Sequence, residues 1–412
     1  MNCAQLLHGV EKGDIMQSYN KWIKWGLGAL AILALIGILV FFGNYFSKNN
    51  VDNSHDTVTT KSNGKNGVQV TGKTNNSNYK TVIKNGHYLT SKARGVTASK
   101  NNNQFNIISF ENGLLDFSKD HFSPSDYVFQ EGQYLDSNTA NDWLGRKSKD
   151  NPNGLNPNDN KKTDSSRNPI YLQTIEEQDY MKQKDGKLEL GGIVLGLGMN
   201  TEDTYQKEQY GANFVQKISA EDRVAQGKEM AQEVVQRYRK MNGISNDVPI
   251  VVAMYAQAPD DSLAGGNFYS WNKSASGDKL GNWNKLNYKT VTLPIQGSQD
   301  DPNQKSPAAD LNKSFTNFTN NVQNFFPNLS SVTGQATYKD SQVKELNVTI
   351  STQFYSATEI TNFANYVAQV APNYLPKGVP VKISISSSSN MQAYVTKQAN
   401  DDKYTTTILG NN

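Results

Sequence analysis

The acidic residues that could do chemistry fall into three groups along this 412-residue chain. Glu131 stands in the stretch FQEGQYL, Glu176–Asp179 form the run EEQD, and Asp260 and Asp261 follow an apolar segment. Two carboxylates held at a suitable separation in a cleft can act as acid and base in glycoside hydrolysis. Each group also has a structural interpretation, because Asp residues make turns and a short acidic helix face can be solvated. A carboxylate-dependent cell-wall hydrolase using Glu131, Glu177 or Asp260 is therefore an alternative hypothesis.

Motifs of zinc proteases and serine hydrolases do not occur in the sequence. It has no HExxH or GxSxG pattern, and its four histidines lack metal-ligand spacing. The one cysteine, Cys3, excludes a disulfide framework. The 41 Lys and Arg residues nearly balance the 38 Asp and Glu residues, so the net charge does not indicate binding to nucleic acid. We predict a protein that is not an enzyme and has no cofactor, metal site or nucleic-acid partner; its oligomeric state stays open.

Polar and aromatic residues near two predicted loops favour binding over catalysis. Tyr and Trp side chains beside loops are typical of grooves that hold peptides or sugars. We predict a binding site where residues 129–146 meet residues 256–271, with a peptide or a cell-envelope component as its ligand. The candidate binding residues are Glu131, Trp143, Arg146, Gln257, Asp260, Asp261, Ser262 and Trp271.

An apolar run over residues 25–46 predicts one membrane-spanning helix. The run WGLGALAILALIGILVFFGNYF carries no charge and is long enough to cross a hydrocarbon core of ~30 Å. Lysines precede it, which favours a cytoplasmic N-terminus. A signal peptide is the alternative, but no A-x-A-like cleavage site follows. The predicted anchor residues are Trp22, Trp25, Leu30, Leu33, Leu35, Ile38, Phe41, Phe42 and Tyr45. The predicted location is the cell membrane, single-pass, with the C-terminal part extracytoplasmic.

Composition divides the remaining chain into segments. A polar, low-complexity stretch after the apolar run predicts a flexible linker, and Pro- and Asn-rich stretches predict surface loops at 147–169 and 258–310. The predicted segments are a cytoplasmic N-terminus (1–24), a membrane anchor (25–46), a linker (47–78), a first lobe (79–304), a second lobe (305–396) and a disordered tail (397–412). Translation starts at Met1 or at Met16, and a start at Met16 would leave residues 1–15 untranslated.

Two parts of the chain repeat one order of elements. The predicted order is helix, strand, strand, helix, strand, at 110–124, 132–135, 188–200, 223–243 and 248–257, and again at 311–327, 334–338, 345–355, 357–376 and 379–387. The last strand, helix and strand of each copy predict a right-handed parallel unit. VPIVVAMY is apolar throughout, which predicts a strand covered on both faces, whereas the alternation in VKISIS predicts one wet face. We therefore predict an α+β fold of two related lobes packed together, arising by internal duplication.

An ordered set of motifs resembles one known family. The stretches FENGLLDFSKDHFSPSDYVFQEGQYL, WLGRKS, GLNP, DGKLELGGIVLGLGMN, VPIVVAMYAQAPDDSLAGGNFYSW and FFPNLSSVTGQATYKD are similar to the CamS family of sex-pheromone lipoproteins of Gram-positive bacteria. The resemblance implies an α+β domain held outside the membrane, and in some members a pheromone peptide released from the lipoprotein signal peptide. Here no lipobox cysteine follows the apolar run. We predict a membrane-anchored binding or envelope-support protein, with a released pheromone precursor as an alternative.

Overall fold

The computed structural model describes residues 68–72, 78–100, 103–295, 307–325, 330–354, 356–387 and 390–409. All of them belong to the compact unit Val58–Asn412. The predicted cytoplasmic segment, the predicted anchor at 25–46 and most of the predicted linker lie outside the described residues. Among the residues that are described, no helix is long and apolar enough to cross a membrane.

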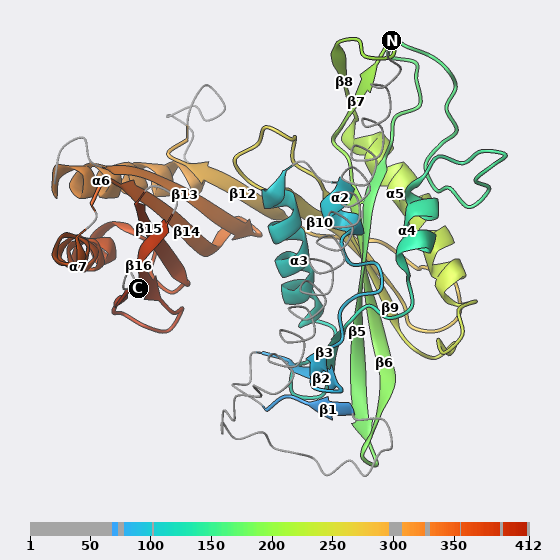
Figure 1. Ribbon diagram of the computed structural model, residues 1–412, viewed down its shortest axis with the longest axis horizontal. Helices are drawn as coiled ribbons and strands as arrows, with labels where there is room; N and C mark the ends of the chain where they lie inside the picture. The colour runs from blue at the N-terminus through green and yellow to red at the C-terminus, as the bar shows by residue number, and fades with distance from the viewer. Residues whose placement is uncertain are drawn as a thin grey trace, which may run out of the picture. The chain divides into compact units, whose positions relative to one another are not determined.

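The first part of the described chain folds around a nine-stranded sheet (Figure 1). The strand order is β1-β2-β4-β5-β6-β9-β10-β11, with β3 beside β2. The strands are β1 Val68–Val70, β2 Lys80–Lys84, β3 His87–Tyr88, β4 Val128–Glu131, β5 Leu172–Lys184, β6 Lys187–Met199, β9 Ile250–Ala256, β10 Asn267–Ser274 and β11 Asn284–Lys285. A separate hairpin consists of β7 Glu202–Gln206 and β8 Asn213–Lys217.

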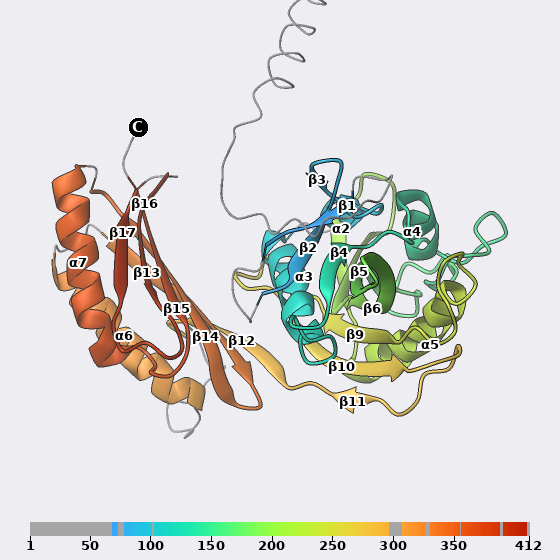
Figure 2. The ribbon, with the colours of Figure 1, turned by 90° about the horizontal axis from the view of Figure 1, so that it is seen from below.

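Helices cover both faces of this sheet (Figure 2). They are α2 Val96–Lys100, α3 Gln104–Ser118, α4 Ser137–Leu144 and α5 Ala220–Tyr238. On one face Phe110 and Leu114 of α3 join a core cluster with Val251, and on the other Met230 and Val234 of α5 join a second cluster. Because both faces are covered, β9 is buried from its first residue through Tyr255, which confirms the prediction made from VPIVVAMY.

The second sheet has six strands in the order β12 to β17. They are β12 Tyr288–Leu293, β13 Ser330–Lys339, β14 Gln342–Thr352, β15 Val381–Ser387, β16 Asn390–Lys397 and β17 Thr405–Ile408. Helices α6 Pro307–Phe325 and α7 Ala357–Tyr374 bury their apolar residues against one face of it. The other face of this sheet is more exposed to solvent, because buried residues alternate with partly exposed or exposed ones along β15. This alternation was predicted.

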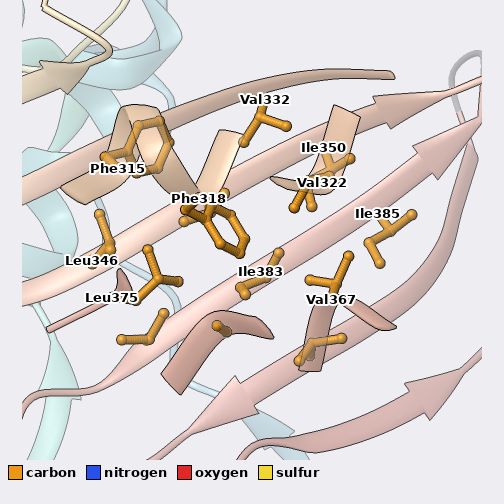
Figure 3. Packing of buried hydrophobic residues seen from close by; sticks show 14 of the residues in the cluster. Phe315, Phe318, Val322, Val332, Leu346, Ile350, Val367, Leu375, Ile383 and Ile385 are labelled. Carbon is orange, nitrogen blue, oxygen red and sulfur yellow. The ribbon is translucent and has the colours of Figure 1, made fainter. Parts of the chain in front are cut away.

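Helical spacing of aromatic residues explains the second core. Phe315, Phe318 and Val322 recur every three or four residues along α6, so they share one face. Figure 3 shows them against Ile383 and Ile350 of the sheet. A capping box at Ser356 and Glu359 fixes the start of α7.

The two sheets share a strand pattern. In each, one central pair is parallel and is joined by a helix: β6 with β9 across α5, and β14 with β15 across α7. The strands on either side pair antiparallel in both sheets, giving the matching series β4-β5-β6-β9-β10-β11 and β12 to β17. The predicted parallel units are confirmed, and common origin by duplication stays a prediction.

Predictions for the ends of the lobes were wrong in three places. Val68–Val70 lie in the predicted linker but pair antiparallel with β2. Thr405–Ile408 lie in the predicted disordered tail but pair with β16 as β17. The boundary at 304/305 falls too late, because Tyr288–Leu293 already belong to the second sheet. In each case a short run of β-branched or alternating residues completes a sheet edge.

Two predictions and one alternative interpretation inside the first lobe were also wrong. The range 258–310 was predicted as surface loop, yet it contains β10, β11 and β12. The predicted strand at Gly132–Leu135 is not a strand, and β4 ends just before it at Glu131. The run EEQD, given a helical interpretation, lies in the middle of β5. The antiparallel neighbour of β6 is therefore β5, which takes the position that β13 has beside β14.

Candidate functional site

A polar groove of about 430 Å³ lies at the carboxyl ends of the parallel strands β6 and β9. This end of parallel strands is where open α/β sheets commonly bind ligands. The Gln257 N–H donates to the Met199 carbonyl at 2.8 Å, and Thr201 Oγ1 donates to the Gln257 carbonyl at 2.8 Å. The groove is lined by Lys100, Asn106, Leu144, Gly145, Ile170, Leu172, Gln173, Asn200, Thr201, Glu202, Asp203, Thr204, Gln257, Ala258, Pro259 and Asp260.

Gln257 lines the polar groove and has a buried acceptor atom without a partner among the described residues. The residue is 4% exposed, and its Nε2 donates to Thr174 Oγ1 at 3.4 Å. Its Oε1 is buried without a hydrogen-bond partner in the described part of the chain. A buried acceptor left unpaired costs about 1–3 kcal/mol. A ligand carrying an N–H or O–H group would supply the missing donor.

The rim of the groove is acidic. Burial, together with Asp261 and Asp260, raises the pKa of Glu202. Asp203 is committed to structure, because its Oδ2 accepts from an Arg167 guanidinium nitrogen at 2.6 Å and from the Ile170 N–H at 2.9 Å. Glu202 and Asp260 are the other two acidic residues of the lining, which also includes Lys100.

The groove brings together parts of both predicted loops. Leu144 and Gly145 come from the 129–146 segment, and Gln257 and Asp260 come from the 256–271 segment. Asp261 follows Asp260 and is exposed. These are the predicted residues that the structure places in or beside the polar groove.

Four predicted residues serve the scaffold instead. Trp143 is 5% exposed and packs edge-on against Tyr238, with ring centroids 5.9 Å apart. Arg146 is partly buried and donates to the Pro157 carbonyl at 3.1 Å. The Ser262 hydroxyl donates to the Ala264 carbonyl within a turn. Trp271 packs against His121 with ring centroids 4.4 Å apart.

Glu131, the remaining candidate, lies at a different cavity. This acidic cavity, of about 290 Å³, is lined by Ser91, Ala93, Arg94, Gly95, Thr97, Ala98, Glu111, Asn112, Leu115, Phe129, Glu131, Ile175, Glu176, Glu177 and Gln178. Glu131 Oε2 accepts from the Ser91 N–H at 2.6 Å. The acidic cavity and the polar groove share no lining residue.

Glu177 is the buried centre of the turn after β4. Its Oε1 accepts from the N–H groups of Gln133 at 2.8 Å and Tyr134 at 2.9 Å, and its Oε2 from the Leu135 N–H at 2.7 Å. The Tyr238 hydroxyl donates to Oε2 at 2.9 Å. Gly132 is required here, because a Cβ on it would lie 2.6 Å from Glu177 Cβ. These contacts explain the polar stretch FQEGQYL as a turn built around one carboxylate.

The geometry of the three candidate residues does not support the hydrolase hypothesis. Glu131 and Glu177 both line the acidic cavity, but Glu177 uses both of its oxygens for hydrogen bonds to the turn and to Tyr238. Asp260 lies at the polar groove. The three predicted carboxylates therefore do not meet in one cleft. Among the described residues, no three Asp, Glu, His or Cys side chains are placed to hold a metal ion.

Asp179 yields a pH-dependent prediction. It is fully buried, its Oδ2 accepts from the Gln133 N–H at 3.0 Å, and burial together with Glu177 raises its pKa well above the ordinary value. The unfolded chain releases this proton near pH 4 while the folded chain retains it, so rising pH costs stability. We expect Asp179→Asn to match the natural chain near pH 4 and to gain in melting temperature relative to it up to pH 8. Parallel melts across this range test it, and a constant difference would contradict it.

Sequence reasoning missed Asn200 and Glu202, which line the polar groove. Asn200 follows β6 as Gln257 follows β9, so the polar residue after each parallel strand was the available signal. Glu202 opens β7 directly afterwards. Glu176 was part of the run EEQD, but nothing in the local pattern placed it in a strand beside Glu111 and Glu131.

The fold and the groove define a mixed α/β protein with two sheets, the first of which carries a polar groove beyond its parallel strand ends. The family model described as CamS sex pheromone cAM373 precursor matches residues 88–403. The chain therefore belongs to the CamS family.

Two solved structures of sex pheromone precursors are also similar to this chain. The crystal structure of a sex pheromone precursor from Lactobacillus salivarius subsp. salivarius UCC118 is 52% identical, with a TM-score of 0.79 over 84% of this chain and 100% of that one. The C-terminal domain of the sex pheromone staph-cAM373 precursor from Staphylococcus aureus is 29% identical, with a TM-score of 0.65 over 76% and 99% of the two chains. The comparison with curated proteins gave no match.

Proposed function

We propose that this CamS-family chain is a non-catalytic, extracytoplasmic binding protein whose ligand occupies the polar groove. The buried, unpaired Oε1 of Gln257 carries the proposal. A polar side chain in a folded core is normally satisfied, and an exception next to a cavity is a sign of a missing ligand atom. A peptide fits this groove, because its backbone offers N–H donors to Gln257.

The acidic rim adds a second feature to the proposed ligand. Glu202 and Asp260 line the groove with Gln257, and Asp261 is close enough to raise the pKa of Glu202. A positive charge on the ligand would relieve the repulsion among these carboxylates. A peptide with a free amino terminus or a basic residue would combine a backbone donor with that charge.

The variant Gln257→Met tests the site, because it keeps the side-chain length and removes both polar atoms. With a mixture of basic tripeptides as the probe, we expect the natural chain to show saturable shifts of the Gln257 side-chain amide in NMR spectra. Gln257→Met should lose at least about 10-fold in affinity, in line with the loss of one hydrogen bond to a buried group. Gln183→Met, on the exposed end of β5, is the matched control. Equal affinity in both variants would contradict the proposal.

The same proposal places the protein at the cell membrane through residues 25–46. The support is the uncharged apolar run in the sequence, followed by a polar stretch. The full chain should fractionate with membranes and stay there after a high-salt wash, whereas a chain starting at residue 47 should not. Release of a short apolar peptide from 25–46 into the medium would favour the pheromone-precursor alternative instead.

A further inference from the structure

The acidic cavity has a feature that the proposed function does not use. Glu111 on α3, Glu131 on β4 and Glu176 on β5 line it together, and Arg94, just before α2, is the one cation among its lining residues. Glu111 and Arg94 are exposed, so they form its mouth, and Glu176 is the most enclosed of the three acids. With Glu177 also in the lining, four acidic side chains lie beside one cation, so acidic groups outnumber basic ones in this cavity.

Glu176 shows where a ligand would bind. Its Oε1 is 3.5 Å from the amide nitrogen of Gln178, at the limit of a hydrogen bond, and its Oε2 is buried without a hydrogen-bond partner in the described part of the chain. A carboxylate oxygen withdrawn from water and left without a donor is costly to the fold. Glu131, by contrast, is held by the Ser91 N–H. Once Glu176 is ionised, the unmet requirement in the cavity is therefore a hydrogen-bond donor that also carries positive charge.

The walls of the cavity distinguish among cations. Leu115, Phe129 and Ile175 contribute apolar surface beside the carboxylates. A hydrated metal ion gains nothing from such walls, whereas the methylene stem of an alkylammonium buries against them. An aromatic ring such as that of Phe129 also attracts ammonium groups through its face. A quaternary ammonium has no N–H and would leave the Oε2 of Glu176 without a donor, whereas the primary ammonium of a lysine side chain carries three N–H groups.

We propose that the acidic cavity binds a primary ammonium group on an alkyl stem, such as a lysine side chain, with Glu176 as the acceptor at its base and Glu111 and Glu131 as flanking charges. This site is independent of the polar groove, because the two have no lining residue in common. Loss of one would leave the other unaffected.

The test is a titration with Nα-acetyl-lysine N-methylamide, followed by calorimetry or NMR. Its norleucine analogue has a similar apolar side chain without the ammonium and is the ligand control. We expect saturable binding of the lysine compound and none of the norleucine compound. Glu176→Gln should weaken binding at least about 10-fold, whereas Glu189→Gln, which removes an exposed charge from β6, should change it less than about 2-fold.

Two further results separate this site from a general charge effect. Arg94→Gln removes the competing cation and should tighten binding several-fold, a gain that a misfolded variant could not produce. Burial raises the pKa of Glu176 to about 8, while a lysine ammonium stays charged up to about pH 10. Affinity should therefore rise from pH 6 to pH 9 as Glu176 ionises between Glu111, Glu131 and Arg94.

The same titration shows whether the bound ammonium group comes from a lysine side chain or from a lipid headgroup. It also gives the results that would contradict the proposal. Tighter binding of the lysine compound than of phosphoethanolamine would support a side-chain stem, and the reverse would overturn that assignment. The ammonium site itself is overturned if the norleucine compound binds equally well, or if Glu176→Gln and Glu189→Gln behave alike. Glu176-dependent binding of Ca²⁺ without binding of the lysine compound would overturn it as well.

Discussion

Glu177→Ala is expected to lower the free energy of unfolding by about 3–5 kcal/mol, the range found when one partner of a buried charged network is removed. Glu177 is 4% exposed, and the N–H groups of Gln133, Tyr134 and Leu135 all donate to its carboxylate. Truncation leaves the N–H groups of Tyr134 and Leu135 and the Tyr238 hydroxyl without this acceptor, and it leaves a cavity beside Tyr238. Urea unfolding followed by tryptophan fluorescence and circular dichroism measures the loss.

Comparing Glu177→Gln with Glu177→Ala distinguishes the loss of the carboxylate from the loss of side-chain volume. Glu177→Gln keeps one oxygen acceptor and the side-chain volume, so its loss should fall between those of the natural chain and Glu177→Ala. Glu189→Ala removes an exposed acid from β6 and should change stability by less than about 0.5 kcal/mol. If Glu177→Ala cost no more than Glu189→Ala, the turn around Glu177 would not be a stabilising feature.

Phe318→Ala should cost about 3–5 kcal/mol in the second sheet, the usual range for emptying a buried phenylalanine site. Phe318 is 0% exposed on α6, its ring centroid lies 6.1 Å from that of Phe315, and it belongs to the core cluster that includes Ile383 and Val348. The helix cannot close the space without moving Phe315, so most of the cavity should remain.

Amide hydrogen exchange gives the sharper measurement, because it reports each sheet separately. Protection should fall most in β13, β14 and β15 and least in β5 and β6. Phe105→Ala is the matched control, since Phe105 is 42% exposed at the start of α3, and it should cost less than about 1 kcal/mol. A uniform loss across both sheets in Phe318→Ala would contradict a local core defect.

Periodicity in the sequence predicted most of the elements with a continuous apolar pattern. The helices α5, α6 and α7 and the strands β6, β9, β14 and β15 lie within a few residues of their predicted positions. Such elements bury one stripe or both faces, and side-chain type alone reveals this. The two parallel pairs followed from the order of elements, because a strand, a helix and a strand leave few alternatives.

Strands with polar residues facing inward were missed. In β10 the inward positions include Ser270 and Asn272, whose side chains donate to the carbonyls of Asn284 and Gly281. In β5, backbone N–H groups of a distant turn satisfy the buried carboxylate of Glu177, and one of them also donates to Oδ2 of buried Asp179. These partners are far away in sequence, so the local pattern resembled a loop or a solvated helix.

The candidate site was predictable only in part for a similar reason. Gln257 and Asp260 stood out because they follow an apolar strand, whereas Asn200 and Glu202 gained meaning only from the parallel pairing of β6 with β9, which brings the ends of both strands together. Glu176 needed the tertiary structure, since its partners Glu111 and Arg94 come from separate elements.

The Glu177 turn also acts at a distance on the polar groove. Leu135, the last residue held by the carboxylate, is followed by Asp136, which caps α4, and the far end of that helix supplies Leu144 and Gly145 to the groove wall. At 1.5 Å per residue, the eight residues of α4 form a rigid spacer of about 12 Å. One buried charge thus sets the position of one groove wall, so ligand affinity should depend on a residue that no ligand in the groove contacts.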